Sequence, residues 1–167
     1  MNSSNFFVPS VSHSTANPDC VFTFPTLRFS LLTNRIVRVE ISPEGTFEDR
    51  PTQTFWYRNQ EKPDGKINYT NSSLFIETDT FLLNYIEKKT GTHENFEFVL
   101  KETGRCISLD EPNPEIFPGT TRTLDETNGP ITLQPGFLSK NGWVQLEDTS
   151  SLIFNINGWL ETRPDQP

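Results

Sequence analysis

The chain has 167 residues, the size of about one domain, and its 22 Asp and Glu against 14 Lys and Arg give a formal net charge of −8. This acidic balance lacks the basic field that drives nucleic-acid binding, and the lack of any run of ~18 apolar residues argues against a membrane span. Hydrophobic residues make up only 33 %, but 12 % of the chain is aromatic, and such large rings bury enough surface to build a core.

The first segment, residues 1–19, is rich in Ser, Asn, Thr and Pro, and we expect it to be a loosely ordered lead-in. It has neither the basic region nor the apolar run of a secretory signal, so we expect a cytoplasmic protein or one whose compartment the sequence leaves open. Residues 20–167 have the pattern of one β domain.

Short runs of alternating apolar and polar residues begin after this lead-in. In RIVRVEIS, for example, Val37, Val39 and Ile41 share one face of an extended chain, while Arg38 and Glu40 share the other. Turn sequences separate the runs, and a sustained helical apolar stripe is missing. We therefore predict an all-β fold with little helix, an antiparallel β-sandwich. Its strands are expected near 21–24, 27–33, 36–42, 54–59, 67–70, 73–78, 81–86, 96–101, 105–109, 143–147, 152–155 and 158–161.

A different pattern occupies residues 110–141, which contain five prolines and little alternation. A loop of this length within a compact domain is usually functional or disordered. We expect it to line a pocket or to dock on another domain.

Two short segments lead to specific structural expectations. In FEDRPTQ, Asp49 and Arg50 are expected to form an ion pair, and Pro51 fixes the direction of the chain. In TFWYRN, Trp56 and Tyr57 are adjacent residues of a predicted strand, so their rings face opposite ways and at least one should be buried.

Motifs for metals and cofactors are missing. His13 and His93 are far apart, and Cys20 and Cys106 lack the spacing of a zinc site, so we expect no metal and no cofactor. Without a secretion signal, two buried free thiols are the expectation, although a disulfide between them stays open. Glycosylation sequons begin at positions 2, 68 and 71, but they matter only in a secretory compartment.

Residues 27–59 and 118–164 carry a family likeness through the motifs FEDRPTQ, GTTRTLD and GFLSKNGW, in this order. They resemble the N-terminal domain of glycoside hydrolase family 31, the group of α-glucosidases and α-xylosidases. The resemblance implies a galactose-mutarotase-like supersandwich. In that family this domain precedes a catalytic barrel, which needs roughly 250 residues and does not fit in this length.

The family's two catalytic carboxylates lie on the barrel, and no position of this sequence matches either, so the resemblance implies no catalytic residue here. It implies instead a packing surface for the barrel and a wall of the pocket that binds an α-glucoside-type carbohydrate. We place that wall at residues 118–149, with Arg122, Asp125, Trp143 and Asp148 as substrate-pocket candidates.

Each candidate also has a plainer interpretation. Asp125 and Asp148 can accept hydrogen bonds from sugar hydroxyls or simply cap loops, and Arg122 can orient Asp125 or lie in solvent. Trp143 can stack on a sugar or belong to the core.

Two other functions stay open. A stand-alone carbohydrate-binding module would expose Trp143 or Trp159 together with polar groups in a groove. A sugar epimerase of the mutarotase type would need a positioned acid and base, for which only His13 and His93 are available.

Overall fold

The structure, a computed structural model, describes residues 11–87, 96–109, 111, 115–120 and 125–163. The chain divides into two compact units. Unit 1 consists of Met1–Leu109 and Asp148–Pro167, and unit 2 consists of Asp110–Glu147.

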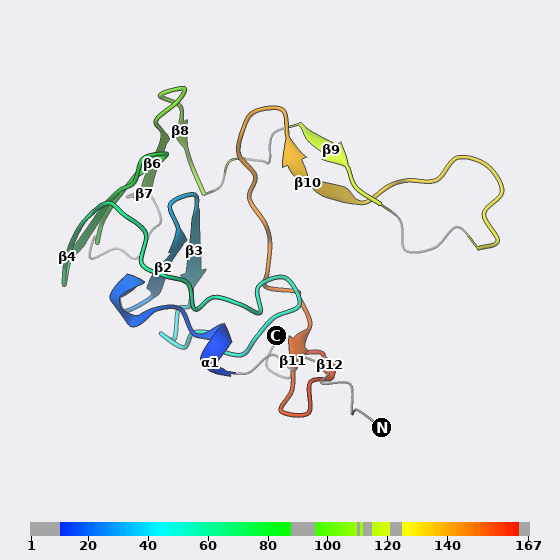
Figure 1. Cartoon of the computed structure of the whole chain (residues 1–167), viewed down its shortest axis with the longest axis horizontal. Coiled ribbons are helices and arrows are strands. Elements are labelled where there is room, and N and C mark those ends of the chain that lie inside the picture. The colour runs from blue at the N-terminus through cyan, green and yellow to red at the C-terminus, as the bar shows by residue number, and fades with distance from the viewer. Residues whose placement is uncertain (1–10, 88–95, 110, 112–114, 121–124, 164–167) are drawn as a thin grey trace. The chain divides into compact units, whose positions relative to one another are not determined.

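Unit 1 begins with two single helical turns, α1 (Val11–Ser14) and the 3-10 turn η1 (Pro18–Cys20), followed by a three-stranded antiparallel sheet. The sheet has the order β1-β2-β3, with strands β1 (Val21–Thr23), β2 (Leu27–Thr33) and β3 (Ile36–Ile41) (Figure 1). The central strand β2 reads LRFSLLT and has five buried residues, because its neighbours and the core cover it.

A five-stranded antiparallel sheet follows in unit 1. Its order β4-β5-β6-β7-β8 is the order of the sequence, since each strand turns back on the one before it. The strands are β4 (Lys66–Thr70), β5 (Ser73–Glu77), β6 (Phe81–Ile86), β7 (Phe96–Leu100) and β8 (Cys106–Ile107). In β5 and β6 the buried residues alternate with half-buried or exposed ones, as expected for strands with one face against the core.

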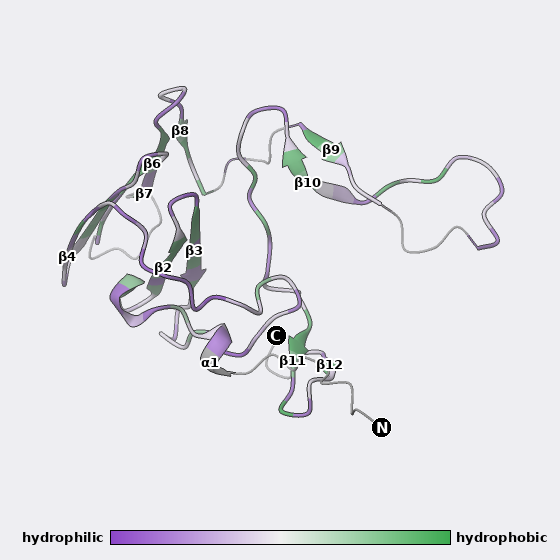
Figure 2. Cartoon of the chain, in the orientation of Figure 1, coloured by the Kyte–Doolittle hydropathy of each residue, from purple (hydrophilic) through white to green (hydrophobic). Residues whose placement is uncertain are grey.

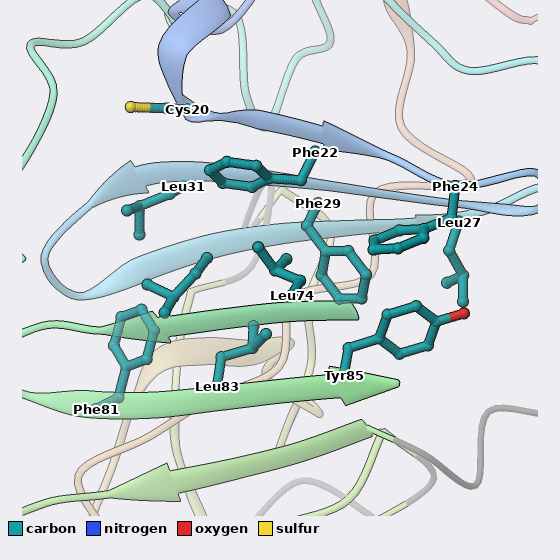
Figure 3. Packing of buried hydrophobic residues seen from close by; sticks show 11 residues of the cluster. Cys20, Phe22, Phe24, Leu27, Phe29, Leu31, Leu74, Phe81, Leu83 and Tyr85 are labelled. Atoms are coloured by element: carbon teal, nitrogen blue, oxygen red, sulfur yellow. The ribbon is translucent and has the colours of Figure 1, made fainter. Parts of the chain in front are cut away.

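The core of unit 1 is formed by side chains from both sheets (Figure 3). Phe29 of β2 is fully buried and lies 5.2 Å from the ring of Tyr85 on β6, while Phe81 of β6 stacks on Phe98 of β7 at 4.7 Å. The whole cluster consists of Cys20, Phe22, Phe24, Leu27, Phe29, Leu31, Leu74, Ile76, Phe81, Leu83 and Tyr85. Five of these eleven residues are aromatic, so large rings contribute substantially to the core of a chain with modest hydrophobic content.

A hairpin of β11 (Ile153–Phe154) and β12 (Leu160–Glu161) completes unit 1. It is fastened to the segment after FEDR, because the Phe154 amide donates to the Pro51 carbonyl at 2.8 Å and Ile153 forms a β-bridge with Thr52. Ile153 and Thr52 are both fully buried.

Unit 2 contains a two-stranded ribbon, β9 (Ile116–Pro118) paired with β10 (Pro135–Ser139). The register shifts within β10. Gly119 and Gly136 allow the two strands to approach, because a Cβ on Gly136 would lie 2.7 Å from the Phe117 carbonyl oxygen. The 110–141 segment therefore holds a ribbon that the sequence pattern did not reveal.

The expected all-β fold with antiparallel sheets is confirmed, and most predicted strands are present with bounds within a few residues. The strand expected at 54–59 is wrong. There the Phe55 amide donates to the Thr52 hydroxyl, and the Arg58 side chain donates to the Phe55 carbonyl, so side chains replace a strand ladder.

The strand expected at 143–147 is also wrong, and the Trp143 carbonyl accepts a hydrogen bond from the Ser139 hydroxyl instead. Because residues 54–59 form no strand, Trp56 and Tyr57 do not lie on opposite faces of a sheet. Both are exposed, against the expectation that one ring would be buried. Within the described part of the chain, no helix has the length and apolar character to cross a membrane.

Candidate functional site

Charged side chains of unit 1 gather around the FEDR segment. The group, called here the charge cluster, joins five arginines to four carboxylates from separate parts of the sequence. Its members are Arg28, Arg38, Glu40, Glu48, Asp49, Arg50, Arg58, Asp148 and Arg163.

The register of β2 against β3 starts this cluster. Arg28 and Glu40 are cross-strand partners. Arg28 donates two hydrogen bonds to the Glu40 carboxylate, from Nε at 2.7 Å and from Nη2 at 3.0 Å. Arg38 contacts the same carboxylate at 2.5 Å, and Arg28 also reaches Asp49 at 2.8 Å. The polar face of β3 therefore faces other charges, and bidentate pairing makes the geometry specific.

Arg58 holds the loop that carries FEDR. Its side chain is only 2 % exposed, and its guanidinium donates to the carbonyl oxygens of Phe55, Glu48 and Arg50 at 2.8–3.0 Å. Burial lowers the pKa of Arg58 to about 10, and the neighbouring charge of Arg38 adds to this. The group is still cationic at neutral pH, and its three bonds to backbone oxygens mark it as a structural residue.

Glu48 and Arg50 form the local pair of this loop. The Glu48 carboxylate accepts from the Arg50 backbone amide at 2.9 Å and from its guanidinium at 2.7 and 2.8 Å. Burial by itself would raise the pKa of Glu48, but these hydrogen bonds, with the charge of Arg163, hold the pKa below its ordinary value. The ion pair expected between Asp49 and Arg50 is therefore replaced, since Arg50 pairs with Glu48 and Asp49 pairs with Arg28.

Asp148 lies at the edge of the cluster, where it is largely buried. Its Oδ2 is 3.6 Å from Arg38 Nη2 and 3.8 Å from Arg163 Nη2, which are ion-pair distances rather than hydrogen bonds. Its backbone carbonyl accepts from Arg163 at 2.6 Å. This residue therefore joins the segment before β11 to the sheet strand β3.

The other pocket candidates belong to unit 2 or lie outside the described residues. Asp125 is exposed, and Trp143 is half-buried with a buried indole nitrogen. Arg122 lies outside the described residues. The candidates are thus divided between the units, with Asp148 in unit 1.

Sequence reasoning missed Arg28, Arg58 and Arg163 as members of the cluster. Alternation did put Arg38 and Glu40 on one face of a strand, which was the available signal. The partners come from strand register and from loops distant in sequence, neither of which alternation reveals.

Both units expose large apolar side chains, and the most exposed of those described lie on the ribbon of unit 2 and in the β11–β12 turn of unit 1. On the ribbon of unit 2, Phe137 is 71 % and Leu138 is 72 % exposed. A shallow depression of about 370 Å³ lies along β9 and β10. Figure 2 shows these two strands partly in green, the colour of hydrophobic residues. In the β11–β12 turn of unit 1, Ile156 is 97 % and Trp159 is 73 % exposed.

The β11–β12 turn is held by its own hydrogen bonds. The Asn155 side-chain oxygen accepts from the amides of Asn157 at 3.0 Å and Trp159 at 3.1 Å, and its amide group donates to Glu161 at 3.1 Å. Gly158 adopts φ 79°, which a residue with a Cβ rarely does. Ile156 and Trp159 thus project from an ordered turn.

The titratable groups of the charge cluster form ion pairs and hydrogen bonds with one another. Each of its four carboxylates faces an arginine, which suits a structural network better than a free acid and base. In the part of the chain that the structure describes, no group of three His, Cys, Asp or Glu is placed to hold a metal ion.

Both cysteines are free thiols. Cys20 is buried, which raises its pKa, whereas Cys106 is exposed, against the expectation that both would be buried. Cys106 lies on β8, a short strand at the edge of the five-stranded sheet.

Comparison of the chain with models of known protein families and with curated proteins finds no match.

Proposed function

We propose that this chain is the non-catalytic N-terminal domain of an α-glucosidase-type glycoside hydrolase, a β-sandwich of the galactose-mutarotase-like supersandwich type. In this proposal it packs on a catalytic barrel and contributes a wall of the sugar-binding pocket. The two sheets of unit 1 that share one core support the sandwich architecture.

The docking function is supported most directly by the exposed apolar side chains of the β11–β12 turn. Ile156 and Trp159 project from it, and the hairpin behind them is fixed to the FEDR segment by the Phe154–Pro51 hydrogen bond. Apolar side chains on a rigid support favour association, because little conformational entropy is lost on docking.

The charge cluster supports the same proposal. It ties FEDRPTQ, one of the motifs that carry the family resemblance, to β2, β3 and the segment before β11. These charged residues therefore serve to position loops, while the bond-breaking carboxylates belong to the barrel.

A test is to co-express the chain with a family 31 catalytic barrel that lacks its own N-terminal domain. We expect the two to co-purify and the complex to hydrolyse maltose, while the chain alone does not. Replacing Ile156 and Trp159 by Ser should abolish co-purification. The matched control is Ile36→Ser, which changes an exposed isoleucine on β3 and should leave the complex intact.

The alternative is a stand-alone carbohydrate-binding module, and the exposure of Trp159 beside polar turn residues favours it. Failure of the chain to bind the barrel, together with saturable binding of maltoheptaose by the chain alone, would replace the proposal by this alternative. Hydrolysis of maltose by the purified chain would overturn both.

A further inference from the structure

Three Asn-Gly pairs occur in the sequence, and no function described above uses them. Asn128-Gly129 and Asn141-Gly142 belong to unit 2, and Asn157-Gly158 belongs to the β11–β12 turn of unit 1. All three asparagines are exposed. Asparagine is a thermolabile residue. It is most labile before glycine, because a residue without a side chain lets its backbone nitrogen reach the asparagine side chain.

The reaction at such a pair is intramolecular and needs only water. The glycine backbone nitrogen gives its proton to water or hydroxide and bonds to the asparagine Cγ, and the side-chain nitrogen takes up a proton and leaves as ammonia. Water then opens the resulting succinimide ring at either carbonyl carbon, so the product is aspartate or isoaspartate. The rate therefore depends on whether the glycine N–H is free and whether the peptide group between the two residues can rotate.

The β11–β12 turn opposes both requirements at Asn157. The Gly158 amide donates to the Asn155 carbonyl oxygen at 2.9 Å, so the attacking nitrogen is already engaged. The Asn155 side-chain oxygen accepts from the backbone amides of Asn157 at 3.0 Å and Trp159 at 3.1 Å, which holds the peptide groups on both sides of the pair. A local structure fixed in this way must open before the nitrogen can attack.

The two pairs of unit 2 are less restrained. Among the residues that the structure describes, the Gly129 and Gly142 amides have no hydrogen-bond partner, and both glycines are exposed. The Asn141 side chain is likewise without a partner in the described part of the chain, and its backbone amide donates to the Ser139 hydroxyl at 3.3 Å, a long bond. The nitrogen and the carbon that must join are therefore both available at Asn141.

Conversion of Asn141 changes the end of the β9–β10 ribbon. The preceding residue, Lys140, pairs with Glu115 at 2.6 Å, and a carboxylate at position 141 competes with Glu115 for this lysine. The isoaspartate product also adds a carbon atom to the backbone of the turn, in which the Ser139 hydroxyl donates to the Trp143 carbonyl at 2.6 Å. The modification therefore alters both the charge and the backbone of this turn.

We propose that Asn128 and Asn141 are sites of spontaneous deamidation, and that the hydrogen bonds of the β11–β12 turn protect Asn157. Unit 2 then gains negative charge as the protein ages, whereas the turn that exposes Ile156 and Trp159 stays neutral. The proposal goes beyond the docking function and does not depend on it.

Incubation of the full chain in mildly alkaline buffer, followed by peptide mapping with mass spectrometry, measures aspartate and isoaspartate at each position over time. We expect deamidation at Asn128 and Asn141 to be at least ~5-fold faster than at Asn157, since only there must a glycine hydrogen bond open first. In concentrated urea the difference should vanish, because the three pairs share the same following residue. Asn141→Gln is the matched control, since its longer side chain disfavours ring closure, and it should remove only the signal at position 141.

Asn155→Ala tests the protection directly, because it removes the side-chain oxygen that holds the turn and keeps the Asn157-Gly158 pair. Deamidation at Asn157 should then rise several-fold, while the rates in unit 2 stay the same. Thermal unfolding of this variant checks that the core of unit 1 is intact. Equal rates at all three positions in the native chain, or a rate at Asn157 that Asn155→Ala does not raise, would overturn the proposal.

Discussion

Units 1 and 2 use large apolar side chains in opposite ways. In unit 1, Phe29 and Phe81 are fully buried between two sheets, and even the arginines of the charge cluster are mostly covered. In unit 2, Phe137 and Leu138 are exposed on a ribbon of only two strands. A two-stranded ribbon has little internal stability in water. We therefore expect most of the stability to reside in unit 1, with little contribution from the exposed side chains of the unit 2 ribbon.

A pair of Phe variants should give the largest difference in stability between the two units. Phe29→Ala should lower the free energy of unfolding by about 3–5 kcal/mol, because it leaves a cavity between the sheets. Phe137→Ala should leave it nearly unchanged, because the ring is already in solvent. Urea denaturation followed by circular dichroism measures both, and equal losses would contradict the assignment of the core.

The charge cluster gives the next largest effect. Arg58→Ala should cost about 2–4 kcal/mol, since three backbone carbonyl oxygens lose a charged donor in a buried place. Arg35→Ala, an exposed arginine in the turn before β3, is the matched control. A urea midpoint for Arg58→Ala equal to that of the control would show that the bonds are not structural.

Acid should loosen the same loop. The pKa of Glu48 is lower in the folded chain than in the unfolded one, so its contribution is fully present above the unfolded value of ~4.3 and is lost as the pH falls through the folded value. We expect the urea midpoint to drop between pH 6 and pH 3. Glu48→Gln should reduce that drop, whereas Glu61→Gln, at an exposed position, should not.

A variant in the ribbon of unit 2 should have little effect on global stability. In Gly136→Ala, the new Cβ would meet the Phe117 carbonyl oxygen at 2.7 Å, so the ribbon must open. Amide hydrogen exchange should show faster exchange in β10, while the thermal midpoint of unit 1 stays unchanged. A lower midpoint for unit 1 would mean that the ribbon supports the core.

Local sequence was a good guide where a strand has one buried face. Alternation located β6 to the residue, because a period of two directly encodes which side chains face the core. The strand prediction failed at 54–59, because the Thr52 and Arg58 side chains take over backbone hydrogen bonds there. It also missed β9 and β10, because a ribbon with several prolines and glycines shows no apolar period.

The all-β class, most strand positions in unit 1 and the acidic balance follow from the amino-acid sequence, since these depend on residue type and spacing along the chain. Tertiary structure alone decided that Asp148 lies with Arg38 and Arg163, and that Asp49 pairs with Arg28 rather than with Arg50. The physical reason is that an ion pair forms between whichever charges the strand register and loop closure bring within about 4 Å, and the distance along the chain does not report that.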